Sequence, residues 1–337
     1  MKRKSWGLIL AVSTLVTACG GEGGGGSPDE SSGQESFRVG LVIPALTNPA
    51  INDLHEGVQA GVAETNIELL VTATDDGAQQ AAAVESYVAA GVDLIMYDSL
   101  DAAAGGPAVE QANAADIPVL VLISAPATGE YVSFIGLPFV ENGRTIGAWM
   151  AEELGSSGTA AVIDGDPAGV ASSELVQGFL EAVSEAGLED PLVSPPTNYS
   201  REEALNITTN VITANPDLMG LYGVIDEIAM GAQDALVAAD REDVLVAGYN
   251  GTCEALVSLL EGEIDFTIMN FTRPLGELAV ETAVQILNGE EVEEFVSGPT
   301  VALDRDTAEA YLNGEETAPS GLPVVEWLEE AEAGECA

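Results

Sequence analysis

Residues 37–73 read FRVGLVIPALTNPAINDLHEGVQAGVAETNIELLVTA. The seven residues at each end are mostly β-branched or aliphatic, which favours strands at Phe37–Ile43 and Ile67–Ala73. Between these two runs, apolar residues recur at helical spacing from Ile51 to Val62 and predict an amphipathic helix. A strand, a helix and a second strand in this order predict a parallel βαβ unit, with helices covering both faces of the sheet.

The alternation of strand and helix continues along the chain in two series. The first series runs to about residue 123, and the second begins at residue 160. We therefore expect an α/β protein with two lobes, each of them a doubly wound parallel sheet. The further strands expected are 94–97, 119–123, 160–163, 220–223, 244–248 and 266–269, and the further helices are 79–90, 107–114, 172–186, 201–215, 226–238 and 252–260.

The amino terminus has the layout of a secretory signal. Three cations lie within residues 1–4, an apolar run follows over 6–16, and small residues precede Cys19. The apolar run is shorter than the roughly 20 residues that a membrane-spanning helix needs. A cysteine directly after the cleavage point is similar to a bacterial lipoprotein signal, which implies a signal peptide at 1–18 and lipidation of Cys19. Residues 19–36, rich in glycine and serine, predict a flexible tether.

The chain is strongly acidic. It contains 56 aspartates and glutamates against nine lysines and arginines, and its formal net charge is −47. Both lysines and one of the arginines lie in the leader. Such a field repels nucleic-acid phosphates and anionic lipid headgroups, so we expect neither as a binding partner of the folded part. The composition is typical either of a saline habitat or of an ordinary acidic secreted protein.

Ligands of open parallel sheets bind at the carboxyl ends of the strands, so the loops there form the candidate site. Six motifs in these loops and in neighbouring elements occur in order along the chain. They are 38–49, Ile117-Pro118, Gly178-Phe179, Asn215-Pro216-Asp217, 226–231 (DEIAMG) and 248–252 (GYNGT). Together they resemble the ribose-binding-protein type of periplasmic solute-binding protein, from residue 37 to about residue 305.

This resemblance implies two lobes joined by three hinge crossings, with a ligand held in the cleft between them. A hinged clamp suits this role, because ligand contacts from both lobes favour the closed state over the open one. The implied boundaries are 37–137 plus 271–299 for the amino-terminal lobe, 138–270 plus 300–325 for the carboxyl-terminal lobe, 326–337 for an acidic tail, and crossings near 137–138, 270–271 and 299–300.

The resemblance also implies which residues line the cleft. Tyr199 stands where relatives place an aromatic that stacks on a sugar ring, and Ser173 stands where sugar binders often have an arginine. Asn250 replaces the commonest aspartate and, unlike a carboxylate, both donates and accepts hydrogen bonds. Two alternatives stay open, namely that Asn48 only shapes its turn and that Tyr199 only packs in the core. The implied cleft residues are Asn48, Ile51, Ile123, Ser124, Ser173, Tyr199, Ile225, Asn250 and Asn270.

These positions supply amides, hydroxyls, a phenol ring and apolar walls but no cation, which disfavours a carboxylate or phosphate ligand. Together, the resemblance and the lipoprotein-like leader imply a monomeric extracytoplasmic lipoprotein, held at the membrane through Cys19. It is expected to capture a neutral sugar or polyol and to deliver it to the permease subunits of an ABC importer. The alternative is a sensory protein of the same fold that presents a small ligand to a membrane receptor without transport.

Catalysis and metal binding find little support in the sequence. The single histidine, His55, lies beside the apolar stripe of the first helix, which favours a half-buried packing role over a Ser-His-Asp triad. The cysteines Cys19, Cys253 and Cys336 lack the spacing of a zinc site. We expect no catalytic residue, no metal ligand and no cofactor. Once Cys19 carries lipid, Cys253 and Cys336 are expected to pair as a disulfide, with two unpaired thiols as the alternative.

The charge imbalance predicts that stability depends on salt. Repulsion between carboxylates acts over a Debye length of about 30 Å at 0.01 M salt and about 3 Å at 1 M. We expect the melting temperature to rise steeply as sodium chloride increases from dilute buffer to molar concentration, which thermal unfolding followed by circular dichroism measures. A melting temperature that stays flat across this range would show that self-repulsion does not limit stability.

Overall fold

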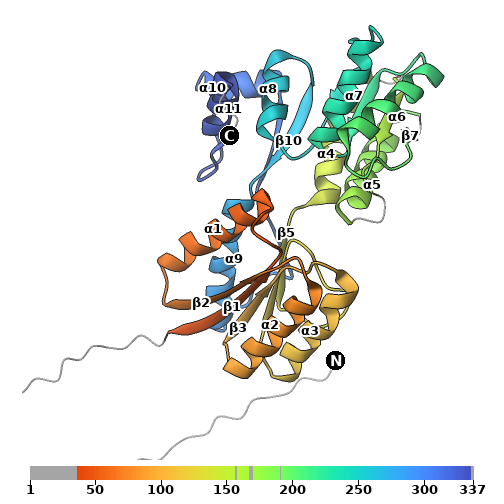
Figure 1. Cartoon of the computed structure of the whole chain (residues 1–337). Coiled ribbons are helices and arrows are strands. Elements are labelled where there is room, and N and C mark those ends of the chain that lie inside the picture. The colour runs from red at the N-terminus through yellow and green to blue at the C-terminus, as the bar shows by residue number, and fades with distance from the viewer. Residues whose placement is uncertain (1–35, 156–157, 167–169, 190, 335–337) are drawn as a thin grey trace, which may run out of the picture. The chain divides into compact units, whose positions relative to one another are not determined.

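The computed structural model describes residues 36–155, 158–166, 170–189 and 191–334. The described residues form two α/β lobes, each built on a six-stranded sheet (Figure 1). This arrangement confirms the two-lobed α/β fold predicted from the alternation of strands and helices.

Several expectations fall on residues outside the described part of the chain. They concern the signal peptide at 1–18, the lipidation of Cys19, the tether at 19–36 (of which only Ser36 is described) and the thiol of Cys336. Within the described ranges, no helix combines the length and the apolar character that crossing a membrane requires.

The amino-terminal lobe has a fully parallel sheet covered on both faces. Its elements are β1 (Phe37–Ile43), α1 (Pro49–Ala63), β2 (Ile67–Ala73), α2 (Gly77–Ala90), β3 (Leu94–Tyr97), α3 (Ala102–Ala114), β4 (Val119–Leu122), β5 (Ser133–Gly136), α9 (Thr272–Leu287) and β11 (Phe295–Ser297). The strand order is β11-β5-β4-β3-β1-β2. Because side chains alternate along a strand, Leu41 of β1 packs with α1 and α9, whereas Val42 packs with α2 and α3.

The carboxyl-terminal lobe repeats this architecture with one antiparallel edge strand. Its elements are α4 (Phe139–Leu154), β6 (Ala160–Ile163), α5 (Val170–Glu185), β7 (Leu192–Val193), α6 (Arg201–Ala214), β8 (Gly220–Gly223), α7 (Asp226–Ala238), β9 (Leu245–Ala247), α8 (Cys253–Glu261), β10 (Phe266–Asn270), β12 (Thr300–Asp304), α10 (Arg305–Leu312) and α11 (Val324–Ala333). The strand order is β12-β10-β9-β8-β6-β7, and β12 runs antiparallel to β10.

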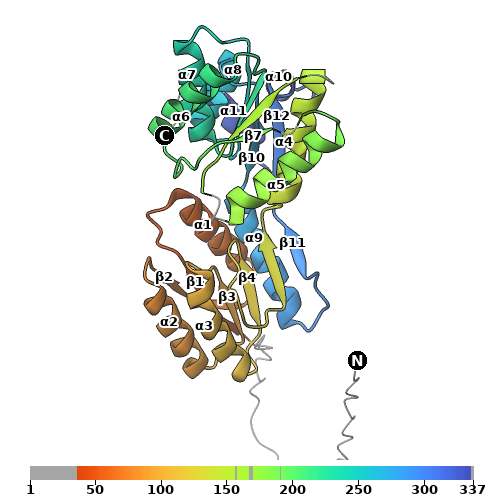
Figure 2. The same cartoon turned by 90° about the vertical axis from the view of Figure 1, so that its right-hand side faces the viewer.

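The chain passes between the two sheets three times (Figure 2). The first passage leads from β5 to α4 through Leu137 and Pro138, and the second leads from β10 to α9 through Phe271. The third passage joins β11 of one sheet to β12 of the other through Gly298 and Pro299. Each lobe therefore combines segments that lie far apart in the sequence.

Helix α1 is fixed on α9 by close backbone contact, and this contact positions the loop at the start of α1. A Cβ atom at Gly57 would lie 1.9 Å from the carbonyl oxygen of Arg273, and a Cβ at Gly276 would lie 2.2 Å from that of Leu54. Only glycine allows the two helices to approach this closely. The amino-terminal end of α1, which carries Asn48 as its cap, is thereby held beside the second passage of the chain.

The carboxyl-terminal residues depart from the expected boundaries. The sequence analysis separates an acidic tail at 326–337 from the lobe, but the structure continues the lobe through α11. Val324 and Leu328 are fully buried in the core of the carboxyl-terminal lobe, and Ala331 is nearly so. Their spacing places them on one face of the helix, so the acidic side chains between them remain exposed. High acidity concealed this short amphipathic pattern.

Candidate ligand-binding site

A cavity of about 1030 Å³ is lined by residues of both lobes. Most of the lining residues lie at or just after the carboxyl ends of strands. These strands are β1, β3 and β4 in the amino-terminal lobe and β8, β9 and β10 in the carboxyl-terminal lobe. Leu137 of the first chain passage also lines it, as do Asn270 and Thr272, the residues on either side of Phe271 in the second passage. The cavity is therefore where an open parallel sheet is expected to bind a ligand, with two sheets contributing instead of one.

The structure brings eight of the nine expected cleft residues to this cavity. Ser173 is the exception, because its side chain is exposed and its hydroxyl donates to the carbonyl oxygen of Val170, 2.9 Å away. Each residue of a helix is rotated by about 100° from the last, so the preceding residues Ala171 and Ser172 face the cavity instead. The eight that line the cavity are Asn48, Ile51, Ile123, Ser124, Tyr199, Ile225, Asn250 and Asn270.

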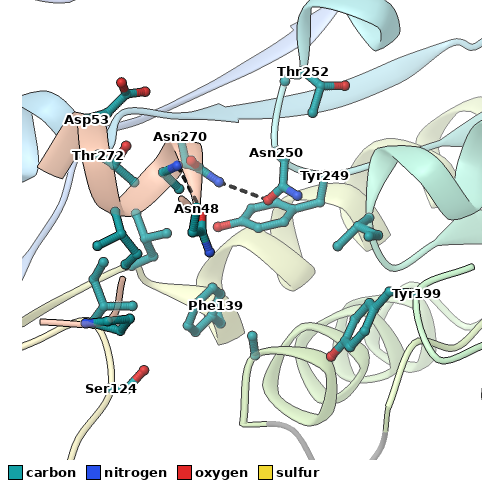
Figure 3. Close-up of a pocket in the computed structure, with 18 of the residues that line it drawn as sticks. Asn48, Asp53, Ser124, Phe139, Tyr199, Tyr249, Asn250, Thr252, Asn270 and Thr272 are labelled. Atoms are coloured by element: carbon teal, nitrogen blue, oxygen red, sulfur yellow. Dashed lines mark hydrogen bonds between the residues drawn. The ribbon is translucent and has the colours of Figure 1, made fainter. Parts of the chain in front are cut away.

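Asn250 and Asn270 form a hydrogen-bonded pair of amides (Figure 3). Nδ2 of Asn270 donates to Oδ1 of Asn250 at 3.0 Å. Backbone hydrogen bonds hold both residues, since the amide of Asn250 donates to Ile268 and the amide of Asn270 donates to Asn250. An amide has both a donor and an acceptor end. The pair thus keeps an NH₂ group on Asn250 and a carbonyl oxygen on Asn270 for other partners.

Buried Asp226 holds the loop that carries Asn250. Its carboxylate accepts hydrogen bonds from the backbone amide of Thr252 at 2.7 Å and from the hydroxyl of Thr267 at 2.8 Å. Asp226 is fully buried, and burial raises its pKa to about 6. Its bonds link the start of α7 to the loop after β9 and to β10, so Asp226 positions the amide pair without lining the cavity.

Asn48 has a structural bond as well as a place in the cavity. Its Oδ1 accepts from the backbone amide of Ala50 at 3.0 Å and caps α1, as the turn-shaping alternative expects. Figure 3 shows its amide nitrogen pointing away from this helix. The side-chain oxygen therefore caps the helix, and the side-chain nitrogen can donate a hydrogen bond to a ligand.

Three of the cavity residues other than glycine have left-handed backbone conformations. The φ angles are +49° at Ile123, +60° at Tyr199 and +122° at Asn250. A positive φ is uncommon outside glycine, and for a β-branched residue such as Ile123 it is an outlier. Such conformations cost about 1–3 kcal/mol each and concentrate at ligand sites, where the surrounding structure enforces them. The strain supports a binding role for this cavity.

Tyr199 is presented to the cavity by a tight turn. The backbone amides of Thr197 and Asn198 both donate to the carbonyl oxygen of Gly165 at 3.1 Å, which fastens the turn to the loop after β6. A Cβ at Gly165 would lie 2.4 Å from the phenol ring of Tyr199, so glycine leaves the space that the ring occupies. Tyr199 remains 39% exposed, which disfavours the alternative of pure core packing.

Sequence reasoning missed three aromatic residues of the cavity: Phe139, Tyr249 and Trp327. The rings of Phe139 and Tyr249 meet edge to face, with centroids 6.2 Å apart. Burial raises the pKa of Tyr249 to about 12, so its hydroxyl stays protonated at neutral pH. Two features of the sequence could have indicated them. Tyr249 directly precedes Asn250, and Phe139 directly follows the first passage.

Sequence reasoning also missed Asp98, which directly follows β3. Its side chain is 1% exposed, and one carboxyl oxygen accepts from the backbone amide of Ser124 at 3.2 Å. Burial raises the pKa of Asp98 to about 8, so at neutral pH this carboxyl is mostly protonated and can donate a hydrogen bond. Further acids line the cavity at Asp53, Asp75 and Glu330, and none of the described lining residues is a lysine, arginine or histidine.

The remaining candidates from the sequence lie elsewhere or differ in role. His55 is half-buried in α1 and does not line the cavity. Cys253 does line it and takes part in a disulfide, whose other half lies outside the described residues. Within the described ranges, no group of three or more histidine, cysteine, aspartate or glutamate side chains is arranged to hold a metal ion.

The same two-lobed architecture occurs in a known family. A model of the periplasmic binding protein domain matches residues 39–291, which is more than half of the chain. The chain belongs to the periplasmic binding protein family. This match confirms the resemblance carried by the six sequence motifs. It also accounts for a cavity that both lobes line, since the family is one of solute-binding proteins.

Several curated relatives of this binding protein are sugar or polyol binders. It is 32% identical to the ribose import binding protein of Escherichia coli (strain K12) over 76% of this chain and 86% of that protein. It is 28% identical to the ribose import binding protein of Bacillus subtilis (strain 168) over 88% of this chain and 97% of that protein. It is also 28% identical to a xylitol-binding protein of Mycolicibacterium smegmatis, over 90% of this chain and 85% of that protein.

A solved structure shows the same fold. The crystal structure of a periplasmic ribose ABC transporter protein from Conexibacter woesei superimposes with a TM-score of 0.77. The two sequences are 22% identical, and the superposition covers 83% of this chain and 95% of that one. At this identity the likeness supports the fold of the binding protein. Its class of ligand has to be inferred from the chemistry of the cavity.

The raised pKa of Asp98 predicts a specific pH dependence of stability. An acid whose pKa rises from 3.8 to about 8 on folding binds a proton in the folded state where the unfolded chain has lost it. Its contribution to stability is therefore lost as the pH rises from about 4 to about 8. We expect Asp98→Asn to gain stability relative to wild type across this window, and to show a constant difference above pH 8.

Urea unfolding at pH 5, 7 and 9 in the same salt measures this difference. Asp116→Asn, which removes an exposed aspartate of the same lobe, is the matched control and should shift stability equally at all three pH values. A parallel pH dependence in Asp98→Asn and wild type would contradict the protonated, buried state of Asp98.

Proposed function

We propose that this protein is an extracytoplasmic lipoprotein, anchored through Cys19, that captures a neutral sugar or polyol and delivers it to the permease of an ABC importer. The observation that carries the proposal is the amide pair of Asn250 and Asn270 in an aromatic-lined cavity whose described lining has no basic side chain. Relatives named for ribose and xylitol support the same class of solute. The protein is proposed to act as a monomer.

Hydroxyl groups match the polar groups of the cavity. Each hydroxyl both donates and accepts, as the amide pair does, and a protonated Asp98 adds a donor. Tyr199 offers a ring face to the C–H face of a sugar, while the isoleucines supply apolar walls. The acids at Asp53 and Asp75 repel anions, and the described lining contains no side chain that would neutralise one. A neutral solute is therefore favoured over a carboxylate or a phosphate ester.

Capture is proposed to work by hinge bending. A solute that touches Asn48 and Ile123 of one lobe and Tyr199 and Asn250 of the other gains its full set of contacts only when the lobes approach. Such differential contact shifts the population toward the closed form. The three passages between the lobes are the segments that absorb the change in backbone angles.

Calorimetric titration tests the class of ligand. The neutral solutes are D-ribose, xylitol and myo-inositol, and the anionic counterparts are D-ribose 5-phosphate and D-gluconate, all in molar salt with protein refolded to remove retained ligand. We expect saturable binding of at least one neutral solute and none of the anions, because the cavity cannot compensate a desolvated negative charge. Binding of an anion with no neutral solute bound would contradict the proposed function.

Substitutions in the cavity locate the site. We expect Asn250→Ala and Tyr199→Ala each to weaken binding of the tightest neutral solute by at least about tenfold, since each removes a partner that the bound solute would cover, worth about 1–3 kcal/mol. Titration calorimetry gives the dissociation constants, and thermal unfolding shows that the variants remain folded.

Two substitutions outside the cavity serve as controls. Tyr131 is 40% exposed, which matches Tyr199, but it does not line the cavity. Tyr131→Ala and His55→Ala are therefore expected to bind with nearly wild-type affinity. Wild-type affinity in Asn250→Ala and Tyr199→Ala as well would place the site elsewhere.

A further inference from the structure

The carboxyl-terminal helix α11 reaches the cavity although it lies beyond residues 39–291, the part that matches the family model. Trp327 and Glu330 both line the cavity. They are three residues apart and share a face of the helix, while Val324 and Leu328 on the adjoining face are fully buried in the lobe. The helix is thus packed as an integral layer of the lobe, with its tryptophan directed to the ligand side.

Trp327 is held against the second passage of the chain. Its ring packs on Phe271 with the ring centroids 5.1 Å apart, and Phe271 is fully buried. Phe271 directly follows Asn270, whose amide is bonded to Asn250. The indole therefore lies next to the segment that carries half of the amide pair.

A second contact, with α8, holds α11 in place. Helix α11 packs on α8, and Cys253, the first residue of α8, lines the cavity and is disulfide-bonded. Leu256, one turn further along α8, also lines the cavity. Trp327 of α11 and Leu256 of α8 thus supply apolar side chains to the lining of the cavity, which also includes the polar residues Thr252 and Thr272.

We propose that α11 is a third wall of the ligand cleft and that the indole of Trp327 contacts the bound sugar or polyol. This inference rests on the proposed function. The indole has the largest flat apolar face of any side chain and a single N–H donor, so it suits a solute with a C–H face bordered by hydroxyls. Tyr199 and Trp327 then supply aromatic contacts from two separate segments, and the amide pair supplies the polar contacts.

Calorimetric titration of Trp327→Leu with the tightest neutral solute of the panel tests the contact. Leucine keeps apolar packing against Phe271 but lacks the aromatic face, so we expect binding at least about tenfold weaker with little change in melting temperature. Trp327→Phe restores an aromatic face and should recover part of the lost affinity. Trp149→Leu is the matched control, because Trp149 stacks on Phe266 and does not line the cavity.

Tryptophan fluorescence provides a second readout. The chain has tryptophans at 6, 149 and 327, and the first lies in the leader. In protein made without the leader, Trp149→Phe leaves Trp327 as the single tryptophan, and its emission should change on titration with the same solute. Trp327→Phe leaves Trp149 alone, and its emission should stay constant.

The outcomes separate this inference from the proposed function. Wild-type affinity in Trp327→Leu, with a neutral solute bound by the wild type, would overturn the role of Trp327 and leave the proposed function standing. An affinity loss equal in Trp149→Leu would also overturn it, since the effect would then be one of general packing. Failure of the wild type to bind any neutral solute of the panel would overturn both proposals.

Discussion

Three passages of the chain between two parallel sheets determine the rest of this structure. Because β11 belongs to one sheet and β12 to the other, neither lobe is a continuous segment. Residues at the carboxyl ends of strands from both sheets line the same cavity, together with Leu137 of the first passage and the two residues that flank Phe271 in the second. The side-chain amide of Asn142 adds a link, since it donates to the hydroxyl of Tyr249 in the cavity and accepts from that of Thr300 after the third passage. The segments that join the lobes are thus contiguous with the cavity residues.

The chemistry of the cavity reflects the charge of the whole chain. Six arginines remain after the leader, and each of them forms an ion pair with a carboxylate that does not line the cavity. The cavity retains acids instead, and the most deeply buried, Asp98, has a pKa raised to about 8 by burial. In the proposed function, polar recognition therefore relies on amides, hydroxyls and a protonated carboxyl. Backbone strain at Ile123, Tyr199 and Asn250 shows how tightly the surrounding loops constrain these groups.

Sequence reasoning succeeded where the hydrophobic period was strong and failed where a short or acidic segment concealed it. The strand predicted at Phe37–Ile43 matches β1 at both ends, because its last five residues are buried and all of them except Gly40 are aliphatic. Ser173 is expected in the cleft, but the structure places it one residue along the helix from Ser172, which lines the cavity. A sequence motif does not fix how a helix is rotated about its own axis. Asp98 and Trp327 were missed for a different reason, as their burial and neighbours depend on tertiary packing. The composition of the acidic tail gave no sign of its contact with the cleft.

In the proposed clamp, a solute in the cleft draws the two lobes together. Small-angle X-ray scattering measures this directly as the radius of gyration of the protein in molar salt, with and without a saturating neutral solute that calorimetry shows to bind. We expect a smaller radius of gyration in the bound state. A radius that is unchanged at saturation would contradict the clamp and indicate a rigid binding site.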